Sequence, residues 1–248
     1  MFVLDVILNE NATMSFINLL SIMSNMTTNI EITFRSNGMS LTVSYKDMQN
    51  DFHIVILQEK FQSYHCNVDE IQLTMDVKKF NSILKNISNN KLHLVIHESH
   101  YNENEFMEGV SPHLIIFHDD DCGEFSVIIC KEDFWLNYEN EKYEEASIFE
   151  LKKSKFNTMV KTLYNLSETT SLTCVNNKLI FKSGSFEIIP DQKLIKSCVE
   201  INHSVNLTYL VHCESLEYHS VFLILNQHMF QAAYRLKNLG IFYVNIWH

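Results

Sequence analysis

Short strand-like runs occupy most of the chain, and only four segments carry apolar residues at helical spacing. Side chains alternate between two faces along a strand, whereas residues three or four positions apart share one face of a helix. The two clearest helical segments contain Phe80 and Phe156, and the other two are residues 10–25 and 206–218. Each half of the chain therefore holds two of them. This distribution predicts an α+β fold of two similar halves, each a strand-rich sheet with two helices on one face.

The strand-like runs are shared between the two halves. In the first half they are residues 2–8, 30–35, 39–45, 52–58, 71–76, 92–97, 113–118 and 124–130. In the second half they are residues 146–151, 170–175, 178–183, 185–189, 197–202, 220–226, 229–236 and 240–247. An acidic segment with large apolar side chains separates the halves. We therefore expect an N-terminal domain at 1–130, a connector at 131–146 and a C-terminal domain at 147–248.

The overall charge limits how this chain can meet nucleic acid. Its 19 basic and 30 acidic residues give a net charge of −11. The average surface repels nucleic acid, so contact with DNA would need a local cluster of cations. Residues 77–97 and 151–167 contain no Asp or Glu.

These two acid-free stretches hold seven lysines on the helix flanks that do not carry the apolar stripe. They are Lys78, Lys79, Lys85, Lys152, Lys153, Lys155 and Lys161. Flexible ammonium groups can contact phosphates without reading a sequence. An ordinary solvated helix face would have the same composition, so the charge pattern alone leaves both interpretations open.

Cysteine usage and hydropathy favour a soluble protein of a reducing compartment. The six cysteines form no CxxC pair, which argues for reduced thiols rather than a zinc ribbon or a disulfide framework. No apolar run approaches the roughly 20 residues that a membrane helix needs. The N-terminal run is expected to be a strand, because it lacks the pattern of a signal peptide. We expect an intracellular protein without a membrane partner.

The sequence holds no residue constellation for catalysis or cofactor binding. It contains no GxGxxG, GxxxxGK[ST], GxSxG or HExxH pattern. His93 and His97 share a strand face, but about 13 Å of strand would separate them, which is too far for one metal ion. The run from His118 to Asp121 fits an acidic turn better than a cation site. No catalytic residue, cofactor or metal site is predicted.

Several segments, in order along nearly the whole chain, resemble the sliding clamp family of proliferating cell nuclear antigen. The N-terminal strand and helix are followed by a glycine-containing hairpin, and EKFQSYHC at 59–66 resembles the family's Phe-x-x-Tyr-Arg-Cys strand. The helical segments NSILKN at 81–86 and KFNTMVKTL at 155–163 resemble the family's inner helices. The segment at 204–211 is similar to Pro-Val-Gln-Leu-Thr-Phe, and residues 233–246 align with the family's C-terminal ending.

The resemblance implies the DNA clamp fold: two similar domains, each with antiparallel sheets outside and two helices on the inner face. Three subunits usually form a ring whose helices line a hole. Such a ring encircles double-stranded DNA independently of sequence, serves as a polymerase processivity factor, and tethers replication and repair enzymes. It has no enzymatic activity and is opened by a clamp loader.

The resemblance assigns the seven lysines to the DNA-facing helices. Lys85 and Lys161 fall on basic positions of the family, whereas Ser82 replaces a usual lysine. Residues 10–25 and 206–218 contain no Lys or Arg, although the family normally has some there. We expect DNA contact to be weak or one-sided.

The family's subunits join by antiparallel pairing of edge strands, which are natural templates for such contacts. The corresponding segments here are residues 124–130 and 185–189. The expected interface residues are Phe125, Val127, Ile129, Phe186 and Ile188.

Family partners insert an aliphatic and two aromatic side chains into a pocket beside the connector. By position, this pocket would use Tyr45, Met48, Leu136, Tyr138, Met229 and Trp247. The family's terminal aromatic and proline positions hold Asn245 and His248 here, and residues 99–112 exceed the usual hairpin length.

Three alternatives remain beside a homotrimeric clamp. One is a monomeric or dimeric viral processivity factor, and another is a subunit of a heteromeric checkpoint ring. The third is an unrelated β-rich binding protein or enzyme. The clamp interpretation places the protein in a host nucleus or at a viral replication site.

Overall fold

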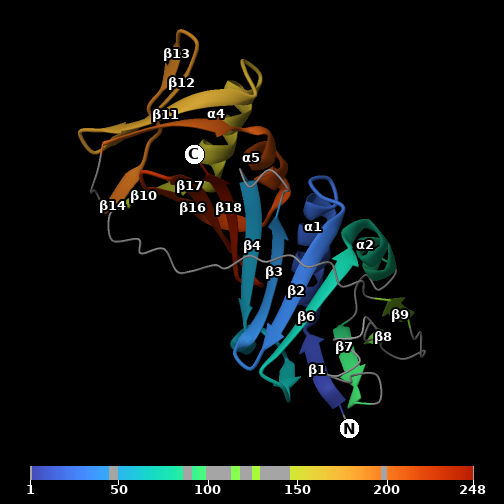
Figure 1. Cartoon of the computed structure of the whole chain (residues 1–248). Coiled ribbons are helices and arrows are strands. Elements are labelled where there is room, and N and C mark those ends of the chain that lie inside the picture. Colours follow the sequence, from blue (N-terminus) through green and yellow to red (C-terminus); the bar gives the residue numbers. More distant parts are fainter. Residues whose placement is uncertain are drawn as a thin grey trace. The chain divides into compact units, whose positions relative to one another are not determined.

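The computed structural model describes residues 2–44, 50–85, 91–98, 113–117, 125–128, 146–196 and 200–247. The chain divides into two compact units, shown in Figure 1. Unit 1 comprises Met1–Val43, Ile54–Phe134 and Asn238–Gly240, and unit 2 comprises Ser44–His53, Trp135–Lys237 and Ile241–His248. The predicted domain boundaries stay a prediction, and most of the predicted connector, residues 131–145, lies outside the described residues.

Unit 1 contains the first half of the secondary structure. Its elements in chain order are β1 (Phe2–Leu8), α1 (Glu10–Met23), β2 (Asn29–Arg35), β3 (Gly38–Ser44), β4 (Asn50–Leu57), η1 (Gln58–Lys60), β5 (Ser63–Cys66), β6 (Glu70–Asp76), α2 (Val77–Lys85), β7 (Leu92–His97), β8 (His113–Phe117) and β9 (Phe125–Ile128). Residues 50–53 of β4 belong to unit 2, and only residues 54–57 to unit 1.

Unit 2 contains the second half. Its elements are β10 (Ser147–Lys152), α4 (Lys153–Tyr164), β11 (Thr169–Val175), β12 (Lys178–Ser183), β13 (Phe186–Ile188), β14 (Lys193–Lys196), β15 (Ile201–Asn206), α5 (Thr208–His212), η4 (Cys213–Ser215), β16 (Tyr218–Leu225), β17 (Met229–Leu236) and β18 (Ile241–Trp247).

The two units repeat one topology. Each runs in the order strand, α-helix, five strands, α-helix, three strands. Unit 1 has the strand orders β5-β1-β7-β8-β9 and β4-β3-β2-β6, and unit 2 has β14-β10-β16-β17-β18 and β13-β12-β11-β15. Replacing each strand by its counterpart turns one pair of orders into the other. The predicted duplication is therefore confirmed, down to the order of the strands.

The α-helices pack together within each unit and bury their apolar stripes. In unit 1, the Phe16 ring of α1 meets the Phe80 ring of α2 edge-on at 6.4 Å between centroids. In unit 2, Phe156 of α4 meets Tyr234 of β17 at 6.1 Å. All four aromatic residues are buried. Full burial of such a side chain contributes about 1.5–3 kcal/mol, which explains why helices without strong intrinsic preference form here.

Corresponding hairpins in the two units place different residues at the positions of positive φ. In unit 1, Gly38 begins β3 with φ +143°, and an added Cβ would lie 2.3 Å from the Ile56 carbonyl oxygen. In unit 2, Asn176 and Asn177 form the β11–β12 turn with φ of 49° and 63°. Asn tolerates this left-handed region better than most residues, and a turn with two such residues matches the twist of a hairpin.

The elements expected from the sequence differ from the structure in several places. The predicted helix over 206–218 is reduced to α5 (Thr208–His212) and the single turn η4. Residues 197–199 of the predicted strand at 197–202 lie outside the described residues, and its last two residues begin β15, which continues to Asn206. Strand β14 was missed: all four of its residues are exposed, so its sequence has no alternation to detect.

Candidate nucleic-acid interface

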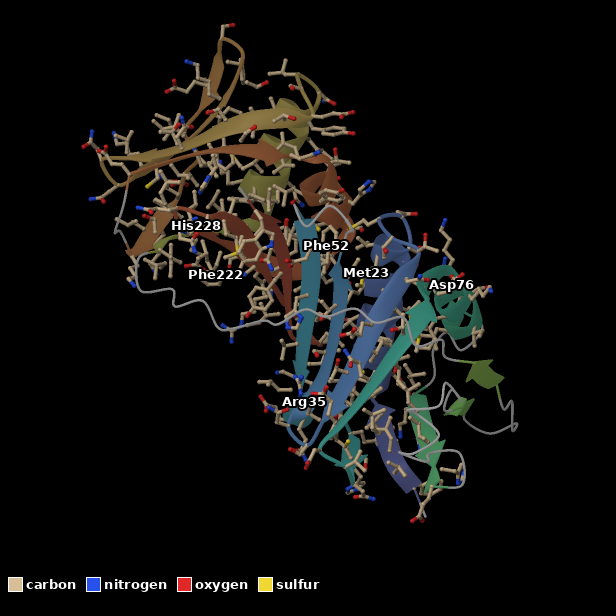
Figure 2. The ribbon with its side chains drawn as sticks, in the orientation of Figure 1. Met23, Arg35, Phe52, Asp76, Phe222 and His228 are labelled. Carbon is tan, nitrogen blue, oxygen red and sulfur yellow. The ribbon has the colours of Figure 1, made fainter. Side chains whose placement is uncertain are left out.

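Helix α2 presents three of the predicted lysines. Lys78, Lys79 and Lys85 are exposed, whereas the apolar residues of the helix are buried except for Ile83, which is half-buried. Asp76, at the junction of β6 and α2 (Figure 2), accepts hydrogen bonds from the backbone N–H groups of Lys78 at 2.9 Å and Lys79 at 3.0 Å. This carboxylate caps the first turn, so the helix begins here. The cap uses backbone N–H groups, and the lysine side chains extend into solvent.

The other four lysines, Lys152 at the end of β10 and three on helix α4, are placed less uniformly. Lys152 and Lys155 are exposed. Lys153 is half-buried, and its Nζ donates to the Leu216 carbonyl oxygen at 2.6 Å. The same Nζ lies 5.0 Å from the centre of the Tyr218 ring. A lysine held over an aromatic face beside a carbonyl acceptor is engaged within the protein, so Lys153 serves the packing of α4.

Lys161, near the C-terminal end of α4, is paired. Its Nζ lies 2.6 Å from Oε1 of Glu214 in η4. The two side chains are 53% and 41% exposed, so solvent screens the pair and its net contribution to folding is small. Lys153 and Lys161 are thus both held by the segment that follows α5.

A groove of about 820 Å³ runs along this side of α4. It is lined by Glu150, Lys152, Lys153, Ser154, Asn157, Thr158, Lys161, Glu214, Tyr218, His219 and Ser220. The three lysines and the hydroxyl groups suit an anion, whereas the two carboxylates reduce the positive potential. Because Lys153 and Lys161 already have partners within the protein, a phosphate in this groove would have to compete with those partners.

The basic helices are not topological counterparts. Counting along each unit, α1 corresponds to α4 and α2 corresponds to α5. Neither α1 nor α5 contains a Lys or Arg, so each unit has one lysine-bearing and one neutral or acidic helix. The exposed side of α1 carries Glu10 and Met14 instead. The two units therefore share one backbone topology, but corresponding helices do not carry the same charge.

The strands predicted to join subunits lie at the ends of their sheets. Strand β9 ends one sheet of unit 1, and β13 ends one sheet of unit 2. Phe186 is 47% exposed and Ile188 is half-buried. Only the backbone of Phe125 and Val127 is described, and Ile129 lies outside the described residues. Their role in an interface stays a prediction.

The predicted partner pocket is described only in part. Tyr45, Met48, Leu136 and Tyr138 lie outside the described residues, as do His248 and the loop at 99–112. Met229 and Trp247 are directly opposite each other in the β17–β18 register. Met229 is buried and Trp247 is half-buried. The structure brings these two predicted residues together, and the pocket itself stays a prediction.

A buried polar network beside Trp247 was not predicted from the sequence. Asp51 of β4 accepts hydrogen bonds from Asn245 Nδ2 at 2.6 Å and Trp247 Nε1 at 2.7 Å. Asn245 Oδ1 in turn accepts from Gln231 Nε2 at 2.8 Å. Asp51 directly precedes the predicted strand run at 52–58, at the end of a polar stretch. Its partners are remote in sequence, so no local pattern indicated these contacts.

The described residues offer little for metal or redox chemistry. No group of three His, Cys, Asp or Glu suited to a metal ion occurs among them. His93 Nε2 lies 2.8 Å from Asp5 Oδ1, and the His97 ring packs 4.6 Å from that of Phe2. The run at His118–Asp121 lies outside the described residues. Burial raises the pKa of the Cys213 thiol to about 12, which keeps it protonated and unreactive.

Comparison with known proteins establishes the class of fold. No family model matches the chain, and no curated protein matches its sequence. Solved structures match it over its whole length, with the antiparallel sheets and four helices described above, and the fold they share is that of the DNA clamps.

The similar structures are proliferating cell nuclear antigens. The protein from Entamoeba histolytica has a TM-score of 0.75 at 14% identity, covering 100% of this chain and 99% of its own. A complex of PCNA2 and PCNA3 from Sulfolobus tokodaii has a TM-score of 0.71 at 14% identity, covering 98% of each chain. This chain therefore has the fold of proliferating cell nuclear antigen. None of the helices in the described ranges is long and apolar enough to cross a membrane.

Proposed function

We propose that this protein is a sliding DNA clamp subunit, which encircles duplex DNA and tethers DNA polymerase and repair enzymes without catalysing a reaction itself. The observation that carries the proposal is the duplicated clamp topology with one lysine-bearing helix in each unit. A clamp fold without cations on its helices would be a poor partner for phosphates. A cationic helix pair on another fold would have no way to enclose a duplex.

The strand edges support assembly into a ring. Strand β9 ends one sheet of unit 1, and β13 ends one sheet of unit 2. Edge strands are templates for pairing with another chain. Pairing β9 of one copy with β13 of the next would be a head-to-tail contact, which can close a ring. We propose three copies, as a homotrimer.

Retention on DNA would come mainly from topology. The exposed lysines Lys78, Lys79, Lys85 and Lys155 supply sequence-independent contacts to phosphates. The net charge of −11 keeps the rest of the surface repulsive to DNA. A closed ring needs little affinity for the duplex, and weak contacts leave it able to slide.

Partner proteins would dock near Met229 and Trp247, and a clamp loader would open the ring. The site of action is then wherever genomic DNA is copied, in a nucleus or at a viral replication site. A heteromeric ring is the second candidate, because one similar structure is a complex of two different antigens, PCNA2 and PCNA3.

Two measurements test the proposal. Light scattering should give three times the 29.1 kDa of one chain. A solitary 29.1 kDa species, with no stimulation of a cognate polymerase on a primed circle, would overturn the clamp assignment. A trimer only in the presence of a second related chain would favour the heteromeric ring.

Charge reversal tests the helix lysines. Lys78→Glu, Lys85→Glu, Lys155→Glu and Lys161→Glu together should abolish polymerase stimulation on long templates. The matched control reverses four exposed lysines outside these helices: Lys60, Lys178, Lys182 and Lys237. Because both variants lose the same charge, equal activity of the two would show that the helix lysines do not meet DNA.

A further inference from the structure

Glu214 is held in place by its surroundings. It lies in η4 between two buried residues, Cys213 and Leu216. The Leu216 carbonyl is fixed by the Lys153 hydrogen bond, and the Leu216 N–H donates to the Cys213 carbonyl at 3.1 Å. The carboxylate therefore starts from an anchored turn rather than from a mobile loop. From there it reaches Lys161 Nζ at 2.6 Å.

The other helix lysines lack such a partner. Within the described part of the chain, no carboxylate forms an ion pair with Lys78, Lys79, Lys85 or Lys155. Lys161 is thus the one lysine in this set whose ammonium group must exchange a carboxylate for a phosphate. Because this exchange breaks the contact with the carboxylate, Lys161 contributes less free energy to DNA binding than a solvated lysine does.

We propose that Glu214 is a positioning residue that lowers the affinity of the clamp for DNA by competing with phosphates for Lys161. The proposal rests on the function proposed above and names the role of a residue in it. When DNA approaches, Lys161 has two anionic partners at one site, the Glu214 carboxylate and a phosphate. It releases and rebinds phosphates easily, which favours sliding over holding.

The test is the salt dependence of DNA binding by Glu214→Gln, measured by anisotropy with a labelled 30-base-pair duplex. Each added phosphate contact makes the affinity fall by about a further 3.5-fold between 50 and 200 mM salt. We expect the Glu214→Gln protein to bind more tightly than wild type at low salt and to show this steeper loss. Glu214→Ala serves as a second neutral variant, and thermal unfolding checks that both variants fold.

The matched control is Glu217→Gln. Glu217 is exposed, lies three residues further along the same segment, and forms no ion pair with any residue that the structure describes. The Glu217→Gln substitution removes the same charge as Glu214→Gln but leaves the pair of Lys161 and Glu214 intact. A second control places Glu214→Gln in a Lys161→Gln background, where its effect should shrink to that of Glu217→Gln.

The outcomes separate the inference from the function it rests on. If wild type stimulates a polymerase and Glu214→Gln behaves like Glu217→Gln, the role of Glu214 is wrong and the clamp stands. A gain that persists in the Lys161→Gln background also overturns it, because the effect is then only long-range charge. If wild type neither binds the duplex nor stimulates synthesis, the proposed function itself fails.

Discussion

The indole Nε1 of Trp247 donates a hydrogen bond of 2.7 Å to the carboxylate of Asp51, across 196 positions of sequence. The carboxylate also accepts from Asn245, so it joins the start of β4 to the end of β18 within unit 2. Strand β18 is therefore held to β4 by a buried polar network that includes Asn245.

Replacing Asp51 by Ala should destabilise unit 2 by about 1.5–3 kcal/mol, because buried donors on Asn245 and Trp247 lose a charged acceptor. Asp51→Asn keeps the shape and should cost less. Chemical denaturation of both variants measures the difference. Trp247 fluorescence, followed in a Trp135→Phe background so that only one tryptophan remains, should shift to the red as the indole loses its partner. An unchanged unfolding free energy for Asp51→Ala would contradict the network.

Among the residues that the structure describes, two glycines have a positive φ, and they differ in what surrounds them, which gives a matched pair. At Gly38, φ is +143° and an added Cβ would lie 2.3 Å from a backbone oxygen. At Gly184, φ is +61° and nothing lies within 4 Å. Gly184→Ala should cost only the left-handed strain of about 1–2 kcal/mol. Gly38→Ala should cost clearly more, since backbone must shift as well, and equal unfolding midpoints for the two would disprove this account.

Phe186 tests the proposed subunit edge. Phe186→Asp places a charge on an exposed apolar position of β13, so a trimer closed through this strand should dissociate toward 29.1 kDa. Leu166→Asp is the control, because Leu166 is similarly exposed at 55% but follows α4 rather than lying on an edge strand. Light scattering at micromolar concentration separates the two variants. A trimer that survives Phe186→Asp would exclude this edge from the interface.

Local spacing was enough to predict the duplicated fold and the lysine-bearing helices. The apolar stripe around Phe80 and Phe156 fixes which side of each helix is buried, so the exposure of Lys78 and Lys155 follows from sequence alone. What spacing misses is the partner of each polar group. The pairing of Lys161 with Glu214 depends on how α4 packs against η4, and no pattern within either segment encodes that contact. For the same reason Asp51 gave no sign of its partners.

Stability at acidic pH should depend on His203. This ring is buried, and its Nε2 lies 2.6 Å from the Asn226 carbonyl oxygen. Burial is the main reason that the pKa of His203 is lowered below its usual 6.5, and the nearby His228 lowers it further, against the opposing effect of the Asn226 carbonyl. In the unfolded chain the same histidine takes up a proton near pH 6.5. Below that pH the unfolded state therefore binds more protons than the folded state, so acidification favours unfolding.

The free energy of unfolding should accordingly fall as the pH drops from about 6.5 toward the lower pKa of the folded state. Above pH 6.5 the contribution of His203 to this free energy should not change with pH. His203→Gln removes this titration, so its unfolding free energy should fall less than that of wild type between pH 6.5 and 5. His212→Gln, at an exposed position of α5, controls for the loss of any histidine. Urea denaturation at a series of pH values measures all three proteins. Parallel curves for wild type and His203→Gln would mean that His203 is as easily protonated in the fold as outside it.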